Sequence, residues 1–254
     1  MFERDSEDLL ALEASMASAL SQLGKDEEAA GVYERVLEAE ERSPRFGPSH
    51  QSTWCTRANL GISYTDLGRF SEAIPLLHDS LAAYDGMGLG PEHPQLGSLP
   101  HHYGSALLGA GRAAEAVPLF QRAIDFRERK FGLHHEFITH SLLSMAEALC
   151  RMGRGWDERL PLLDRAAAIH DLSIGRENNR NEAGLARALR AAAECCEEAG
   201  HLAGAESRWA KCVSTATKVS GYCSCTGCVS LCSVSLYNLN MSGSIYSHPP
   251  LNSF

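Results

Sequence analysis

Residues Leu60 to Ala73 read LGISYTDLGRFSEA, and this stretch decides the fold class of the chain. Before Gly68 the apolar residues recur at close to helical spacing, and after it they do so again from Ala73 to Leu81. Glycine adopts the left-handed conformation that ends a helix without the steric cost of a side chain. The stretch therefore predicts a helix, a tight turn at Gly68 and a second helix with Ser71 as its N-cap.

The same pattern returns along the chain with a nearly constant period. Turn glycines equivalent to Gly68 are separated by 44, 43, 42 and 47 residues, at Gly24, Gly68, Gly111, Gly153 and Gly200. A second glycine, in the loop after each helix pair, recurs at separations of 43, 42 and 43 residues, at Gly47, Gly90, Gly132 and Gly175. Two independent marks with one period indicate a helical repeat array.

The repeat predicts an all-α superhelical solenoid of about five antiparallel helix hairpins over residues 1–218. We expect the hairpins near residues 6–42, 51–85, 94–130, 136–173 and 181–218, with Pro94 opening the third. Small residues such as Gly61 and Gly104 fall where the two helices of a hairpin should approach closely. The fourth hairpin has Arg159 at a position where other hairpins have alanine, after a one-residue insertion, so we expect a local irregularity there.

The motif L-G-x-x-Y-x-x-L-G-R-F-x-E-A at Leu60–Ala73 resembles the tetratricopeptide repeat. The period of 42–43 residues and the G-x-x-H-P loop at Gly90–Pro94 resemble the long-loop variety found in kinesin light chains and in the sensor arrays of some nucleotide-binding signalling ATPases. The resemblance covers roughly residues 6–218 and implies a right-handed superhelix whose first helices line a concave groove. In kinesin light chains an asparagine of the first helix meets the ligand backbone, and the matching positions here are Ser15, Asn59, His102, Ser144 and Ala191.

The resemblance implies that such a groove binds a peptide or helix of a partner protein. The register of the repeat places a set of polar residues on the groove side, and these are the expected partner-binding residues: Asn59, Thr65, Asp66, His101, Ser105, His140, Glu147, Arg151, Arg187, Arg190 and Glu194. Arg187 and Arg190, with Arg151 one unit away, suit an acidic peptide or a terminal carboxylate. The alternative reading of each residue is an ordinary solvated helix face.

Composition restricts the classes of function. The 254-residue chain has a formal net charge of −9, which disfavours a general nucleic-acid role because phosphate binding needs a positive field. The N-terminus has no secretory signal, and no long apolar stretch predicts a membrane span. We therefore expect a cytoplasmic protein without membrane association. Its thiols should be reduced, and five cysteines should act as small buried hydrophobes, namely Cys55, Cys150, Cys195, Cys196 and Cys212.

No catalytic motif is recognisable in the sequence. There is no P-loop, no G-x-G-x-x-G after a strand and no G-x-S-x-G. His135 and His140 are five residues apart, so they do not share the helix face that a zinc-protease motif needs. His135 instead occupies the loop position of His50 and His93, where a capping role is expected. We expect no enzymatic activity, no cofactor and no metal.

The tail of residues 219–254 differs from the rest because it contains no Asp, Glu, Lys or Arg. Its cysteines, Cys223, Cys225, Cys228 and Cys232, could form a metal knuckle or carry lipids, but their spacing and the missing basic flank favour an irregular, disordered extension. The sequence thus predicts a protein-interaction scaffold. The alternative is a regulatory or sensor array that is a fragment of a larger signalling ATPase, and the oligomeric state is not indicated.

Overall fold

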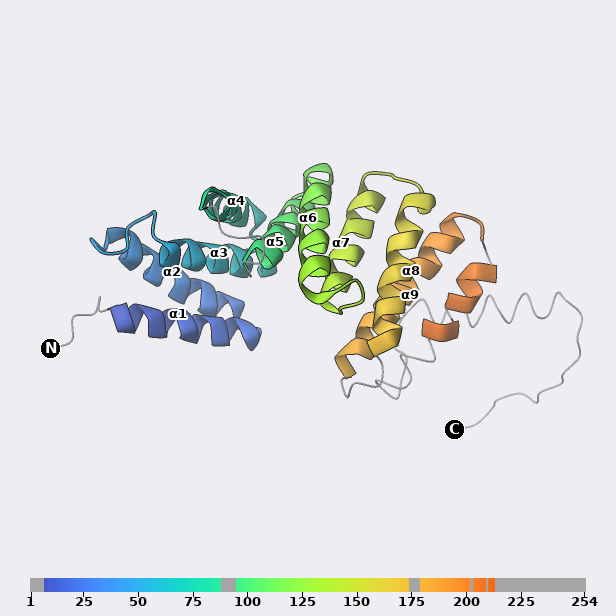
Figure 1. Ribbon diagram of the computed structural model, residues 1–254, viewed down its shortest axis with the longest axis horizontal. Coiled ribbons are helices and arrows are strands. Elements are labelled where there is room, and N and C mark those ends of the chain that lie inside the picture. Colours follow the sequence, from blue (N-terminus) through green and yellow to red (C-terminus); the bar gives the residue numbers. More distant parts are fainter. Residues whose placement is uncertain (1–6, 88–94, 174–178, 202, 209, 213–254) are drawn as a thin grey trace, which may run out of the picture.

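The computed structural model describes residues 7–87, 95–173, 179–201, 203–208 and 210–212, and all regular secondary structure in these ranges is helical. The helices follow one another along the molecule as stacked hairpins (Figure 1). This arrangement confirms the predicted all-α solenoid. Several features discussed above lie outside the described residues. They are Pro94, His93, the repeated loop motifs at residues 89–94 and 174–178, the end of the fifth hairpin and the tail of residues 219–254.

Four hairpins are complete in the described part of the chain. Their helices are α1 (Glu7–Gln22), α2 (Asp26–Arg42), α3 (Gln51–Asp66), α4 (Phe70–Gly86), α5 (Gln95–Gly109), α6 (Ala113–Phe131), α7 (Phe137–Arg151) and α8 (Trp156–Ser173). The fifth hairpin begins with α9 (Asn179–Glu198), and a helical segment that includes residues 203–208 follows it. None of the helices in the described ranges is long and apolar enough to cross a membrane.

Each second helix packs between two first helices. Helix α6, for example, contacts both α5 and α7, and α8 contacts both α7 and α9. The first helices also contact one another directly, α1 with α3, α3 with α5 and α5 with α7. First and second helices therefore form two layers, and the helix axes turn from across the page at α1–α3 to upright at α6–α8 in Figure 1.

The hairpin turns are all built on the predicted glycines. Gly24, Gly68, Gly111, Gly153 and Gly200 have φ angles of 74°, 75°, 79°, 68° and 74°. The Gly68 N–H donates to the Thr65 carbonyl (3.0 Å), and the Arg69 N–H donates to the Tyr64 carbonyl (2.8 Å). The same two bonds recur in the other four turns, which makes each of them a Schellman closure.

The predicted N-cap at Ser71 is wrong. Helix α4 already begins at Phe70, so Ser71 lies inside its first turn and Arg69 occupies the N-cap without a side-chain capping bond. Arg69 instead donates two bonds, of 2.8 and 2.7 Å, to the Glu72 carboxylate. The same basic–acidic pair stands after Gly24 and Gly111, where the negative partner also suits the positive end of the second helix.

Loop histidines cap the following helices, as expected. His50 is the N-cap of α3, where its Nδ1 atom accepts from the Ser52 N–H (3.1 Å). The His135 Nδ1 atom accepts in the same way from the Phe137 N–H (3.3 Å). His50 and His135 therefore have a structural role, because each accepts a hydrogen bond from a backbone N–H in the first turn of a helix that has no partner within the helix.

The fourth hairpin is irregular, as the sequence predicts. Helix α8 starts three residues after its turn glycine, whereas α2, α4 and α6 each start two residues after theirs. Arg159 is buried, with 6% of its surface exposed, and its guanidinium pairs with Glu198 of α9. A buried charge needs such a partner, so the arginine that replaces the usual alanine joins the fourth hairpin to the fifth.

The cysteine prediction is correct in part. Cys195, Cys196 and Cys212 are buried, whereas Cys55 is only half-buried and Cys150 is exposed. Cys150 was expected in the core because it follows apolar residues in α7. Its side chain is exposed although the preceding residue, Leu149, is buried.

Small residues allow the two helices of a hairpin to approach closely. A Cβ atom added at Gly61 would lie 2.8 Å from Leu77 Cγ, and one added at Gly104 would lie 2.9 Å from Phe120 Cε1. Leu77 and Phe120 are fully buried and have no open space to move into. The second helix therefore packs directly on the backbone of the first.

We predict that Gly104→Leu lowers the free energy of unfolding by about 1–3 kcal/mol, because the new side chain overpacks against Phe120. Chemical denaturation monitored by circular dichroism measures the change. The matched control is Gly31→Leu in α2, where an added Cβ meets no atom within 4 Å. Equal unfolding free energies for the two variants would contradict the close approach at Gly104.

Candidate binding groove

Two adjoining pockets lie along the first helices of the third to fifth hairpins. One, of about 420 Å³, lies between α5, α6 and α7, and the other, of about 530 Å³, lies between α7, α8 and α9. His140 of α7 lines both, so the two pockets adjoin at this residue, and we call them together the groove. We call the first the phenylalanine pocket, lined by Gly97, Ser98, His101, His102, Phe126, Arg127, Lys130, Phe131, Phe137 and His140.

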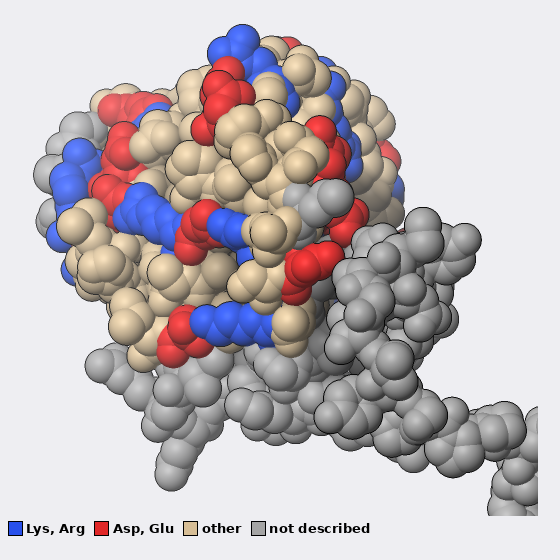
Figure 2. Space-filling view, turned by 90° about the vertical axis from the view of Figure 1, so that its right-hand side faces the viewer, with Lys and Arg blue, Asp and Glu red and all other residues tan. Residues whose placement is uncertain are grey.

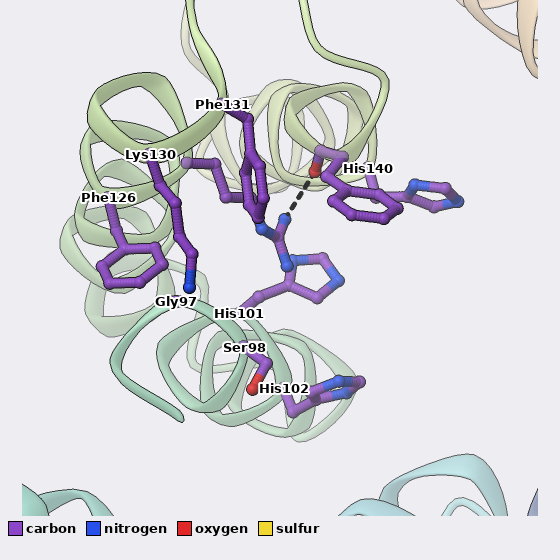
Figure 3. A pocket seen from close by; sticks show the side chains of 10 residues that line it. Gly97, Ser98, His101, His102, Phe126, Lys130, Phe131 and His140 are labelled. Carbon is purple, nitrogen blue, oxygen red and sulfur yellow. Dashed lines mark hydrogen bonds between the residues drawn. The ribbon is translucent and has the colours of Figure 1, made fainter. Parts of the chain in front are cut away.

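The walls of the phenylalanine pocket come from three elements. Figure 3 shows Phe126, Lys130 and Phe131 on α6, with His101 and His102 of α5 across from them. Phe126 packs against α5 at Gly97, where an added Cβ would lie only 2.2 Å from the phenylalanine ring. The absence of a side chain at this glycine therefore makes room for one aromatic wall.

Arg127 of α6 is the partly buried cation of this pocket. Its Nη1 atom donates to the Phe137 carbonyl (2.8 Å) and to Ser141 Oγ (2.6 Å), both of which are neutral. Burial lowers the pKa of Arg127 to about 10, and no carboxylate offsets this effect. The guanidinium still carries its charge at neutral pH, so the pocket contains a positive charge without an acidic partner among the described residues.

The histidines of this pocket are neutral at physiological pH. Burial, together with the electrostatic effects of His102, Arg127 and His140, lowers the pKa of His101 to about 2. Burial and Arg127 lower the pKa of His102 to about 4. Because Ser141 accepts from Arg127, its own proton can go to His101 Nδ1 (3.1 Å), which leaves the His101 proton on Nε2.

We call the second pocket the arginine pocket. It is lined by His140, Leu143, Ser144, Ala146, Glu147, Cys150, Arg159, Leu163, Arg187, Arg190, Ala191, Glu194, Cys195 and Glu198. Arg190 lies 3.5 Å from the Glu194 carboxylate on the same helix. Arg187 is exposed, and no described carboxylate lies within ion-pairing distance of it. This pocket therefore contains two paired guanidinium groups, those of Arg159 and Arg190, and an unpaired one, that of Arg187.

The structure brings six of the predicted residues together in this groove, namely His101, His140, Glu147, Arg187, Arg190 and Glu194. Arg151 does not line either pocket, because it pairs with Glu147 (2.5 Å) and donates to the Leu108 carbonyl (2.7 Å). Three positions that match the family's asparagine, His102, Ser144 and Ala191, do line the groove.

The remaining predicted residues lie outside these two pockets. Ser105 and Thr65 donate their hydroxyl protons to carbonyls of their own helices, at His101 (3.0 Å) and Gly61 (2.8 Å). Asn59 is half-buried in α3, and Asp66 is exposed at its end. Partial loss of hydration and the nearby Asp26 raise the pKa of Asp66. Their use in binding remains a prediction.

Sequence reasoning missed the aromatic walls and Arg127 because it considered only first helices. One signal was present in the sequence. Arg127 falls four residues after Ala123 and three after Ile124, both of which are buried, so it continues the apolar face of its helix. A cation on the apolar face of a helix is a candidate for a buried functional charge.

The sequence matches the model of the tetratricopeptide repeat family over residues 7–86 and 52–129. The chain is a tetratricopeptide repeat protein. Solved structures with the same fold include a protein of Podosopora anserina described as a kinesin light chain with nearly identical TPR-like repeats. It is 21% identical, the match covers 87% of this chain and 99% of that one, and the TM-score is 0.68.

Two further structures show the same architecture. BtubC (BKLC) of P. vanneervenii is 16% identical over 85% of this chain and 83% of that one, with a TM-score of 0.69. YrrB, described as a TPR protein with an unusual peptide-binding site, is 19% identical over 80% and 84% of the two chains, with a TM-score of 0.51. No protein with a curated description matches the chain in sequence.

The second helices of this tetratricopeptide repeat protein carry a ladder of ion pairs. Arg122, Arg165 and Arg208 follow one another at intervals of 43 residues, and each bonds an acid of the preceding second helix. The partners are Asp85 (2.9 Å), Glu128 (2.5 Å) and Asp164 (2.7 Å). Figure 2 shows acidic and basic side chains alternating over the C-terminal side of the molecule. These three pairs neutralise the charges of their own members within the fold.

We predict that stability falls as the pH drops from about 6.5 to about 5. His101 and His102 remain neutral in the folded state because their folded pKa values are about 2 and about 4, whereas an unfolded histidine binds a proton near pH 6.5. The unfolded state therefore binds more protons in this window, and stability rises with pH there. Each such histidine contributes up to about 1.4 kcal/mol per pH unit.

The variant His102→Gln should reduce this slope, because glutamine cannot take up the proton. Urea denaturation at several pH values between 7 and 5 measures the slope. His134→Gln, which removes an exposed imidazole, is the control and should keep the wild-type slope. A wild-type slope in His102→Gln as well would contradict the buried, neutral state of His102.

Proposed function

We propose that this tetratricopeptide repeat protein is a non-enzymatic scaffold that binds an acidic peptide or helix of a partner protein along α5, α7 and α9. The observation that carries the proposal is Arg187, an exposed guanidinium in the arginine pocket without a described carboxylate partner. A free guanidinium recognises a carboxylate with two parallel hydrogen bonds. YrrB, which has a similar fold, is described as having a peptide-binding site, and this supports the same use of the groove here.

The groove offers a peptide more than one contact. Its two pockets adjoin at His140 and together follow three successive first helices, which suits an extended or helical segment better than a compact ligand. Glu147 and Glu194 hold Arg151 and Arg190 on their own helices, so these four side chains form an ordered polar rim. Arg187 is then the charge that a partner's carboxylate would neutralise.

A scaffold role is favoured over catalysis by the histidines of the groove. A general base works best when its pKa lies near the operating pH. His101 and His102 have pKa values of about 2 and about 4, so they are too weakly basic for this purpose at pH 7.

We also propose that the protein acts in the cytoplasm, where its five described cysteines would stay reduced as free thiols.

We predict that acidic peptides selected from a random library on the full-length chain lose about tenfold or more in affinity for Arg187→Glu. The reversed charge removes one attractive contact and adds a repulsive one. Fluorescence anisotropy of labelled peptides measures the affinities of the wild type and the variant.

The matched control is Arg35→Glu, which makes the same charge change on the exposed surface of α2, where Arg35 bonds only the Gly31 carbonyl of its own helix. This variant should bind like the wild type. Equal losses in both variants would mean that binding depends on net charge alone, and an unchanged affinity in Arg187→Glu would remove the arginine pocket from the proposal.

A further inference from the structure

Arg127 has an unused hydrogen-bonding edge. Both of its bonds, to the Phe137 carbonyl and to Ser141 Oγ, come from Nη1. Its Nε and Nη2 atoms have no acceptor among the described residues. These two atoms are also not among the fully buried side-chain nitrogen and oxygen atoms that lack a hydrogen-bond partner. They therefore have access to open space, and the space beside Arg127 is the phenylalanine pocket. The Nε–Nη2 edge of a guanidinium is the geometry that holds both oxygens of a carboxylate.

The charge of the pocket points to an anion. None of its lining residues is acidic, whereas the adjoining arginine pocket includes Glu147, Glu194 and Glu198. The Nζ atom of Lys130 lies 5.6 Å from the ring centroids of both Phe126 and Phe131. A chain with a net charge of −9 thus contains a pocket that is locally positive. An incoming anion would offset the desolvation of the Arg127 charge.

The walls of the pocket point to an aromatic group. Phe126 is buried, whereas Phe131 and Phe137 are 40% and 51% exposed although their rings lie only 5.4 Å apart. The His135 ring packs against both exposed rings, at 4.8 and 4.6 Å. Large aromatic side chains that gather beside a cavity without covering one another mark a surface for an apolar ligand.

We propose that the phenylalanine pocket is a binding site for an aromatic carboxylate. The carboxylate binds the Nε–Nη2 edge of Arg127, the Nε2–H of His101 can donate to one of its oxygens, and the aromatic ring lies against Phe126, Phe131 and Phe137. The volume of about 420 Å³ is in the range of small-ligand pockets, about 300–1,000 Å³. This site does not depend on Arg187, because it lies in the part of the groove that α5, α6 and α7 form.

The same chemistry can come from a free aromatic acid or from an aromatic residue at the carboxyl end of a chain. The test is a titration of the full-length protein with 3-phenylpropionate, followed by the histidine ring and backbone amide resonances in NMR spectra. We expect saturable shifts at His101, His102 and the residues of α6 that line the pocket. Its neutral amide, 3-phenylpropionamide, should bind at least about tenfold more weakly, because the charge-assisted bonds to Arg127 are lost.

Two further probes test separately how much the carboxylate and the aromatic ring contribute to the affinity. Propionate keeps the carboxylate without the ring, and inorganic phosphate is an anion of another shape, so both should bind at least about tenfold more weakly than 3-phenylpropionate. Equal affinity of the acid and its amide would overturn the proposal, since Arg127 would then contribute nothing. Equal affinity of phosphate would overturn it as well, because the site would be a general anion site.

Matched variants locate the site. Arg127→Gln should weaken 3-phenylpropionate at least about tenfold and leave the amide unaffected, whereas Arg129→Gln, an exposed arginine of the same helix, should change neither. If Arg127→Gln fails to fold, as judged by circular dichroism, Phe131→Ala tests the aromatic wall and should weaken 3-phenylpropionate more than propionate. Wild-type affinity in the folded variants would overturn the proposal.

The peptide Gly-Ser-Gly-Ser-Gly-Phe, as the free acid and as the amide, distinguishes the two sources. If the free acid binds like 3-phenylpropionate and its amide does not, the pocket accepts a chain terminus. If only the small acid binds, the ligand is a free molecule, and both outcomes support the site. Arg187→Glu should leave all these affinities unchanged, so failure of the peptide groove and failure of this site give different results.

Discussion

The structure depends on one backbone constraint, which is the positive φ of a single glycine in each hairpin. At Gly68 and its equivalents in the four complete hairpins, only three or four residues separate one helix from the next. Two backbone bonds close every turn in the same way. A residue with a Cβ atom adopts this conformation only at a cost, so the position of the glycine sets the position of the turn. Five similar turns then produce five similar hairpins and a solenoid.

The arginines of the solenoid fall into two groups, those paired with an acid within the fold and those that line a pocket without an acidic partner. Between second helices, arginines such as Arg122 and Arg165 bond acids of the preceding hairpin, so these charges are neutralised within the fold. In the two pockets, Arg127 of α6 and Arg187 of α9 have no described acidic partner. Exposed pairs contribute little stability individually, but they remove free charge from one surface. The unpaired cations of the two pockets are available to ligands, which is the physical basis of both proposed binding sites.

Burial also decides what the histidines of the groove can do. His101 and His102 stay neutral because the charged form would lose its hydration next to Arg127. A neutral imidazole donates and accepts hydrogen bonds, but at a pKa this low it is a poor proton acceptor at pH 7. The groove thus combines fixed positive charge, neutral hydrogen-bonding groups and aromatic surface. This combination suits recognition of an anionic ligand rather than chemistry on it.

The sequence by itself determined the helix type, the turns and the repeat, because helical periodicity and glycine conformation are local properties. The capping roles of His50 and His135 were predictable for the same reason. Cap assignment at Ser71 failed, since the length of a turn depends on the backbone bonds that close it. The register of the repeat predicted that Arg187 lies on the groove side of its helix. Only the structure shows that Arg187 has no described acidic partner there.

Only the tertiary structure decided how residues far apart in the sequence meet. The phenylalanine pocket joins Gly97, Arg127 and Phe137 from three helices, and its shape depends on the rotation of each helix against its neighbours. The ion-pair ladder likewise joins residues about 40 positions apart, such as Asp85 and Arg122. Periodicity identifies the face of a helix, whereas the direction of each long side chain is set by the neighbours that bury or bond it.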